Sequence, residues 1–225
     1  MRQGGERMKT KNPAKIVTWL ALLMASLVVP TLGSKAMAAD SHADDPMVLM
    51  RQVTDDVLKN VDANRKLYKK DKSKLYAMVD ELILPHVDFR YVAQLALGRN
   101  WRGASEDQRT RFTQAFRELL VRNYATALLT YNDPDVKYTA SRISTDGRDA
   151  VVNSQVTSPK GQSTALTYRL YRNKAGEWKL YDVTAEGVSL VTNYRNGFDR
   201  EIRQHGLDAL IEKIRTQDFK PDSKS

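Results

Sequence analysis

Two carboxylates four residues apart, Asp182 and Glu186, lie beside Gly187 in the stretch YDVTAEGVSLV. Such a pair can act as a general acid and base, or as a glycosidase pair, when both groups face one cleft about 5 to 9.5 Å apart. Here Asp182 ends a stretch that alternates like a strand, and Gly187 marks the crossing into a helical pattern. We therefore favour a structural role, in which both carboxylates accept backbone N–H groups at a strand-to-helix joint.

Other residue types that could carry chemistry are sparse. The three histidines, His42, His86 and His205, are isolated, and no H-x-x-x-H spacing occurs. The absence of cysteine excludes disulfides and thiolate metal sites. The chain contains neither a G-x-S-x-G nucleophile motif nor a phosphate-binding loop. The sequence therefore predicts no metal, no cofactor and no catalytic residue.

The first 38 residues have the three parts of a secretory signal peptide. A basic segment precedes the apolar run IVTWLALLMASLVV, which is shorter than the roughly 20 residues that cross a bilayer. Ala36 and Ala38 then form an A-x-A cleavage site. We expect cleavage after Ala38 and export to the bacterial periplasm, which suits a cysteine-free secreted chain. The alternative is that the segment is retained as an N-terminal anchor.

Cleavage would change the charge of the protein. The full chain has 36 Lys and Arg against 27 Asp and Glu, a net charge of +9. Residues 1–38 hold six of the basic residues and one acid, so 30 basic and 26 acidic residues remain, a net charge of +4. This excess is too small and too scattered for nucleic-acid binding, although it would suit contact with anionic lipid headgroups.

Helical periodicity dominates residues 46–98, where apolar residues recur at steps of three and four and Pro85 interrupts the pattern. A longer helix begins at Ser105, which forms a capping box with Gln108, and Pro134 ends it. Taken alone, its apolar stripe indicates an ordinary core. The residues of the stripe are Phe112, Phe116, Leu119, Leu120, Tyr124, Ala127, Leu128 and Tyr131.

After Pro134 the apolar period changes to two, which predicts strands. The segments PKGQ and NKAG are turn sequences, so these strands should form consecutive antiparallel hairpins. Helical patterns return from Val188 onward. The order predicts an α+β fold in which an antiparallel sheet of about four strands packs against several helices. We expect a single domain over residues 39–216 and a polar, flexible tail at 217–225.

Two long segments together resemble the MlaC family, also called the toluene-tolerance auxiliary family, of periplasmic phospholipid-binding proteins. They are LPHVDFRYVAQLALGRNWRGASEDQRTRFTQAFRELLVRNYATALLTY and GEWKLYDVTAEGVSLVTNYRNGFDREIRQHGLDALIEKI. The landmarks of the resemblance are Leu84, Pro85, Leu97, Gly98, Trp101, Phe112, Phe116, Arg117, Tyr124, Trp178, Tyr181, Asp182, Glu186 to Ser189, and Gly206 to Ile211.

The resemblance implies a twisted antiparallel sheet, partly NTF2-like, capped by helices, with an apolar slot for acyl chains between sheet and helices. It also implies a carrier that shuttles phospholipid between an outer-membrane lipoprotein and porin complex and an inner-membrane ABC transporter, which it meets through the transporter's substrate-binding subunit. Such a carrier would maintain the lipid asymmetry of the outer membrane. No catalytic residue is known in this family.

With this resemblance, the apolar faces predict which residues line the slot. The candidates on the long helix are Phe116, Leu120, Tyr124, Leu128 and Tyr131. The candidates on the inward sheet face are Val152, Val156, Leu166, Tyr168 and Leu170. Val188, Leu190 and Val191 are expected close by.

We expect a monomer that carries bound phospholipid as cargo, with no cofactor and no nucleic-acid partner. The headgroup should stay largely in solvent, because no buried cluster of Arg or Lys is apparent that would grip its phosphate. Two alternatives remain open. One is an NTF2-like enzyme that acts on a hydrophobic small molecule with Asp182 as base, and the other is a lipoprotein carrier or chaperone.

Overall fold

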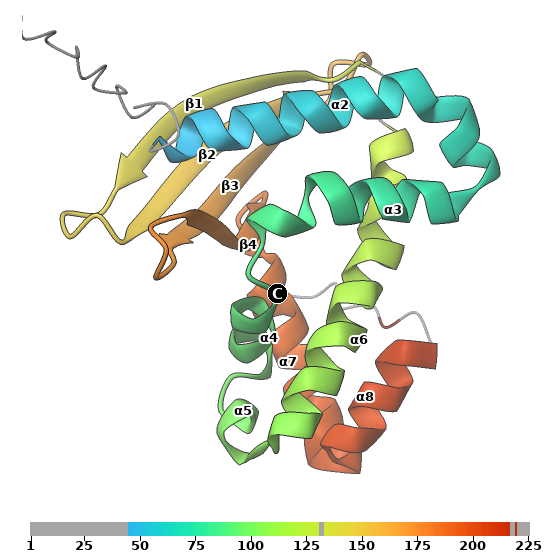
Figure 1. Cartoon of the computed structure of the whole chain (residues 1–225), viewed down its shortest axis with the longest axis vertical. Helices are drawn as coiled ribbons and strands as arrows, with labels where there is room; N and C mark the ends of the chain where they lie inside the picture. Colours follow the sequence, from blue (N-terminus) through green and yellow to red (C-terminus); the bar gives the residue numbers. More distant parts are fainter. Residues whose placement is uncertain (1–44, 131–132, 217–218, 220–225) are drawn as a thin grey trace, which may run out of the picture. The chain divides into compact units, whose positions relative to one another are not determined.

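Five antiparallel strands in the order β1-β2-β3-β4-β5 form the sheet of the computed structural model, which describes residues 45–130, 133–216 and 219. The expected α+β fold, an antiparallel sheet packed against helices, is confirmed (Figure 1). The fifth strand has two residues, too few to show a period in the sequence. The strands are β1 (Asp135–Ile143), β2 (Asp149–Thr157), β3 (Ser163–Arg172), β4 (Trp178–Ala185) and β5 (Val188–Ser189).

Helices precede and follow the sheet in the chain. Those before it are α2 (Pro46–Lys70), α3 (Lys72–Leu82), the 3₁₀ turn η1 (Leu84–His86), α4 (Phe89–Leu97), α5 (Asn100–Gly103), α6 (Glu106–Tyr124) and the 3₁₀ turn η2 (Ala125–Leu129). Those after it are α7 (Leu190–His205) and α8 (Leu207–Thr216). Within the described part of the chain, none of these helices combines the length and apolarity that a bilayer crossing requires.

Two helix boundaries differ from the expectation. The first helical region also breaks at Asp71, whose carboxylate accepts the N–H of Ser73 and caps α3. The capping box of Ser105 and Gln108 is confirmed at the start of α6, but α6 ends at Tyr124 and the chain tightens into η2. Apolar residues three positions apart lie on one face of an α-helix and also of a 3₁₀ helix. The apolar stripe alone therefore does not show where α6 changes into η2.

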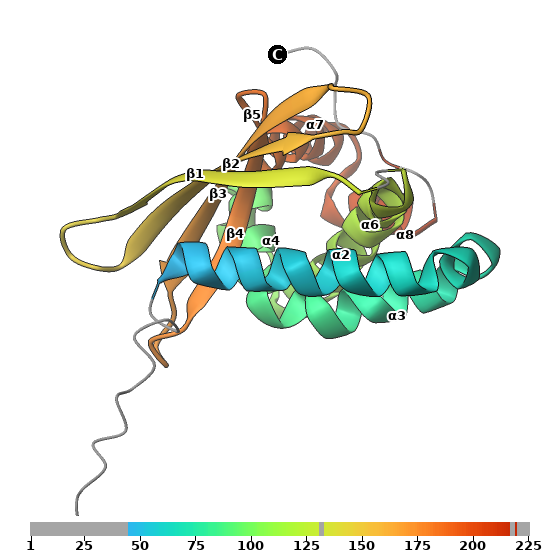
Figure 2. The same cartoon turned by 90° about the horizontal axis from the view of Figure 1, so that it is seen from above.

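The inner face of the sheet is covered over only part of its length. In the β2–β3 ladder, Val152 lies opposite Tyr168, and Val156 lies opposite Thr164 further along the same face. The first half of α2 crosses this face, and Met50 packs there in a cluster with Val152 and Tyr168 (Figures 1 and 2). The ends of the strands around Val156 extend beyond this cover, so an apolar sheet surface remains for other elements to enclose.

An aromatic cluster joins α6 to α7 away from the sheet. Phe112 and Phe116 of α6 pack edge-on against Phe198 of α7, with ring centroids 5.4 and 5.2 Å apart. Tyr194 contacts Phe116 at 5.1 Å, and all four side chains are fully buried. Such pairs add about 0.5 to 1.5 kcal/mol each beyond the burial of their area, so this cluster fixes the two helices together.

A bulge in β4 decides which way Asp182 points. Arg169 pairs with Asp182, while the next residue of β3 pairs with Leu180, so Tyr181 is the extra residue. Beyond the bulge Val183 shares a face with Tyr168, and Asp182 is turned to the opposite face.

Asp182 holds the start of α7, and Glu186 stabilises the preceding turn. The buried carboxylate of Asp182 accepts hydrogen bonds from Ser189 Oγ at 2.7 Å and from the Val191 N–H at 3.1 Å. Glu186 and Gly187 have φ of 49° and 82° and form a two-residue hairpin loop, and Glu186 Oε1 accepts the N–H of Ala165 at 2.8 Å. Both carboxylates therefore have the structural role expected from the sequence.

Replacing Asp182 by alanine should lower the free energy of unfolding by about 2 to 3 kcal/mol, because the buried N–H of Val191 would lose its acceptor. Urea denaturation followed by circular dichroism measures this loss. The matched control is Glu186→Gln, an exposed side chain whose amide oxygen can still accept the Ala165 N–H. We expect that control to stay within about 0.5 kcal/mol of wild type. An Asp182→Ala variant as stable as wild type would contradict the assigned role.

Candidate functional site

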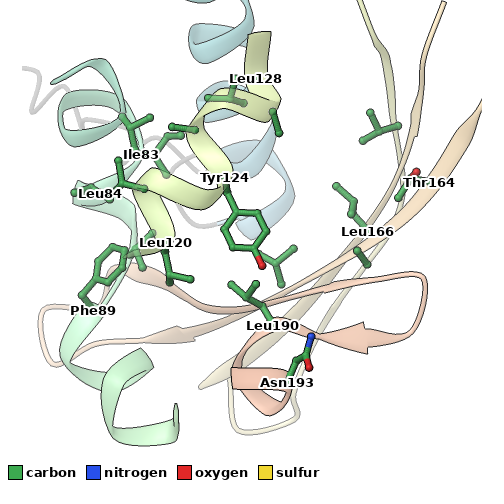
Figure 3. Close-up of a pocket in the computed structure, with 18 of the residues that line it drawn as sticks. Ile83, Leu84, Phe89, Leu120, Tyr124, Leu128, Thr164, Leu166, Leu190 and Asn193 are labelled. Carbon is green, nitrogen blue, oxygen red and sulfur yellow. The ribbon is translucent and has the colours of Figure 1, made fainter. Parts of the chain in front are cut away.

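The hydrophobic core of the described residues is divided into three clusters. One joins α4, α6, α7 and α8, a second joins α2, α3 and η2, and a third joins the sheet to the start of α2. Where the three meet, they leave a cavity of about 660 Å³ (Figure 3). This volume lies within the range of about 300 to 1,000 Å³ typical of small-molecule sites.

The uncovered end of the sheet forms one wall of the cavity. Its lining residues lie on the inner face of β2, β3 and β4, beyond the area that α2 covers, and they are Val156, Thr164, Leu166, Val183 and Ala185. The β4 bulge places the last two on this face. The carboxylate of Asp182 is absent from the lining, because it lies on the other side of the strand.

Helices and turns form the remaining walls. The end of α6 and η2 contribute Leu120, Val121, Tyr124, Ala125, Ala127 and Leu128. The segment from α3 to the start of α4 contributes Val79, Ile83, Leu84, Val87 and Phe89, and the β5–α7 segment contributes Val188, Leu190 and Asn193. The figure shows side chains from these segments directed toward a common space between the helices and the sheet (Figure 3).

Few polar groups reach this cavity. Tyr124, Thr164 and Asn193 carry the polar side chains of the described lining, and no acid, amine, imidazole or guanidinium belongs to it. Tyr124 and Val188 are each 44% exposed, so the cavity is open to solvent beside them. A site of this kind can hold apolar chains and can meet a few hydrogen-bonding groups at its polar side chains.

The sequence-predicted residues divide into two groups around this geometry. Those that line the cavity are Leu120, Tyr124, Leu128, Val156, Leu166, Val188 and Leu190. Those buried in the neighbouring clusters, outside the cavity lining, are Phe116, Val152, Tyr168, Leu170 and Val191. Tyr131 lies outside the described residues, as do the expected signal peptide and all of the expected tail except Phe219. Alternation and helical period identify an apolar face, but not which part of that face another element covers.

Sequence reasoning missed the wall formed by α3, η1 and the start of α4. Val79 belongs to the periodic apolar residues of its helix, but nothing in that period distinguishes a cavity wall from a core. The available signal is the interruption at Pro85, since a broken helix leaves Ile83, Leu84 and Phe89 at irregular angles.

Among the described residues, neither the acid/base pair nor His86 and His205 form a reactive site, and His42 lies outside them. Asp182 and Glu186 each bind backbone groups of different segments and do not line the cavity. Burial and the nearby Lys179 lower the pKa of His86, which favours its neutral form, and His205 pairs with Glu201 at 3.0 Å. Among the residues that the structure describes, no three His, Asp or Glu side chains come close enough to hold a metal ion.

Comparisons with known proteins agree on one family. A family model described as MlaC protein matches residues 51–216. The intermembrane phospholipid transport system binding protein MlaC of Haemophilus influenzae is 28% identical over 212 residues, 93% of this chain and 97% of that protein. Toluene tolerance protein ttg2D of Pseudomonas putida is 27% identical over 167 residues, 74% of this chain and 77% of that protein.

A solved structure shares the fold. A phospholipid-binding protein from Ralstonia solanacearum, solved in complex with a phospholipid, matches with a TM-score of 0.70 and 32% identity. The match covers 76% of this chain and 94% of that one. Because the family model spans most of the chain and this likeness extends to the whole fold, the protein belongs to the MlaC family.

Proposed function

We propose that this protein is a phospholipid carrier whose cavity holds the acyl chains of its cargo. The observation that carries this proposal is the cavity itself, about 660 Å³ in volume, with a wholly uncharged lining in the described residues. A related protein with the same fold was solved with a phospholipid bound, which supports this choice of cargo. The described lining offers only the phenol of Tyr124 and the hydroxyl of Thr164 as reactive groups, with no carboxylate or imidazole to activate them, so we propose binding without catalysis.

The energetics of acyl chains dictate how such a carrier must release its cargo. Removing one CH₂ group from water is worth about 0.8 kcal/mol, so two chains of about 16 carbons represent roughly 25 kcal/mol. Release into water against that free energy would take on the order of days. A membrane or a partner's cavity is equally apolar, so direct handover avoids this cost. We therefore propose that cargo moves while the carrier is docked to its donor or acceptor.

We propose that the chain is exported, cleaved after Ala38, and acts as a monomer in the periplasm. There it would shuttle phospholipid between an outer-membrane lipoprotein and porin complex and the substrate-binding subunit of an inner-membrane ABC transporter, and so maintain outer-membrane asymmetry. The name of the Haemophilus influenzae relative, an intermembrane phospholipid transport system binding protein, supports this role.

Replacing Leu166 by aspartate should reduce the phospholipid that copurifies with the protein at least about tenfold, because a charge in the cavity wall is costly to bury beside acyl chains. Mass spectrometry of an organic extract, normalised to protein, measures bound lipid. The matched control is Ile143→Asp on β1, which is exposed and does not line the cavity. The control should retain the wild-type amount. Wild-type lipid content in Leu166→Asp would contradict the proposed site.

Cargo should also leave the carrier slowly when no apolar acceptor can touch it. Loaded protein and lipid vesicles are placed in chambers separated by a membrane that passes lipid monomers but neither protein nor vesicles. Radiolabelled phospholipid should reach the vesicles with a half-time on the order of days, and much faster when the chambers are joined. Complete transfer across the separating membrane within an hour would show that release proceeds through water.

A further inference from the structure

The tip of the α2–α3 hairpin concentrates positive charge. Residues 65–74 read RKLYKKDKSK, with six basic residues and one acid. Five of the basic side chains are exposed, and no ion pair engages any of them among the residues that the structure describes. They are Lys66, Lys69, Lys70, Lys72 and Lys74. Figures 1 and 2 both show this tip projecting away from the sheet.

Some lysines of the tip are placed unfavourably for the helices that carry them. Lys72 and Lys74 occupy the first turn of α3, where the helix dipole favours acids, and α3 has no acidic residue in that turn. Lys66 and Lys70 are four residues apart on α2, a spacing at which like charges repel. Only Lys69 and Lys70, in the last turn of α2, suit the dipole there. Charges that lower helix stability in this way, without a gain in packing, are typical of functional surfaces.

An exposed leucine lies among these charges. Leu67 is 45% exposed, one of the few large apolar side chains of the described residues that remain so open. It lies beside Lys66 and one helical turn before Lys70. A basic helical surface with an exposed apolar side chain is the combination that binds anionic bilayers, where lysines attract headgroups and the apolar group enters the interface. Lysine, unlike arginine, offers a mobile point charge suited to a diffuse anionic layer.

The tip is structurally connected to the cavity. Leu75, the first buried apolar residue after the tip, packs in the cluster that also contains Val79, and Val79 lines the cavity. The same cluster includes Ala125 and Leu128 of η2, which also line the cavity. A surface that binds the tip would therefore contact the end of the α2–α3 hairpin. The second helix of this hairpin, α3, forms part of the cavity wall.

From this geometry we propose that the α2–α3 tip is a docking surface for anionic phospholipid bilayers. It binds the membrane surface itself and not a single headgroup, because the lysines are spread over two helix ends and form no enclosed pocket. This contact would bring the carrier to a bilayer before cargo is exchanged. It is independent of what the cavity holds.

The test is flotation of the purified chain, without residues 1–38, with vesicles of phosphatidylcholine alone or with added phosphatidylglycerol. Wild type should float with the anionic vesicles, remain unbound with the neutral ones, and be released at high salt. Replacing Lys66, Lys69 and Lys70 by glutamine should weaken binding about 100-fold, as expected for three lysines near an anionic surface. Leu67→Ser should weaken binding while leaving the charge unchanged.

The matched control replaces three exposed lysines elsewhere, Lys137, Lys160 and Lys174, by glutamine, and it should float like wild type. Copurifying lipid should be the same in all these variants, so a failure of the docking surface is distinguished from a failure of the cavity. The proposal is overturned if wild type does not bind anionic vesicles, or if the tip and control variants bind equally.

Discussion

The structure depends on a hydrophobic core that is divided into three separate clusters. Domains of this size usually have one contiguous hydrophobic core, but here three clusters, each centred on a different set of elements, stop short of one another. Each cluster is packed around fully buried side chains, such as Phe116, Leu75 and Leu170. The cavity is the space that remains between them.

Two local devices keep those walls in place. The bulge in β4 turns Val183 toward the cavity and Asp182 away from it, and Asp182 then fixes the start of α7 through Ser189 and the Val191 N–H. This arrangement explains why a carboxylate pair lies near an apolar cavity without entering it. Its negative charge is used on a helix N-terminus, which leaves the apolar wall uncharged. A phospholipid in the cavity would join the three clusters with the apolar contacts that the chain itself lacks.

Much of the fold could be predicted from the sequence, because it is encoded locally. The capping box at Ser105, the change of period after Pro134 and the turn sequences predicted the long helix and the hairpins, and the structure confirms them. The structural role of Asp182 and Glu186 followed from their place between a strand and a helix. The cavity lining could be predicted only in part, because coverage depends on distant elements. Val152 and Val156 share one strand face, yet α2 covers the first and leaves the second open.

Photo-crosslinking would locate the acyl chains within the protein directly. The protein is loaded with a phospholipid that carries a photoreactive group near the end of an acyl chain, irradiated, digested and analysed by mass spectrometry. We expect crosslinks at two places that are distant in sequence, residues 120–128 and residues 156–166. Crosslinks confined to β1 or to the outer face of the sheet would contradict it, because they would place the acyl chains outside the space between the three clusters.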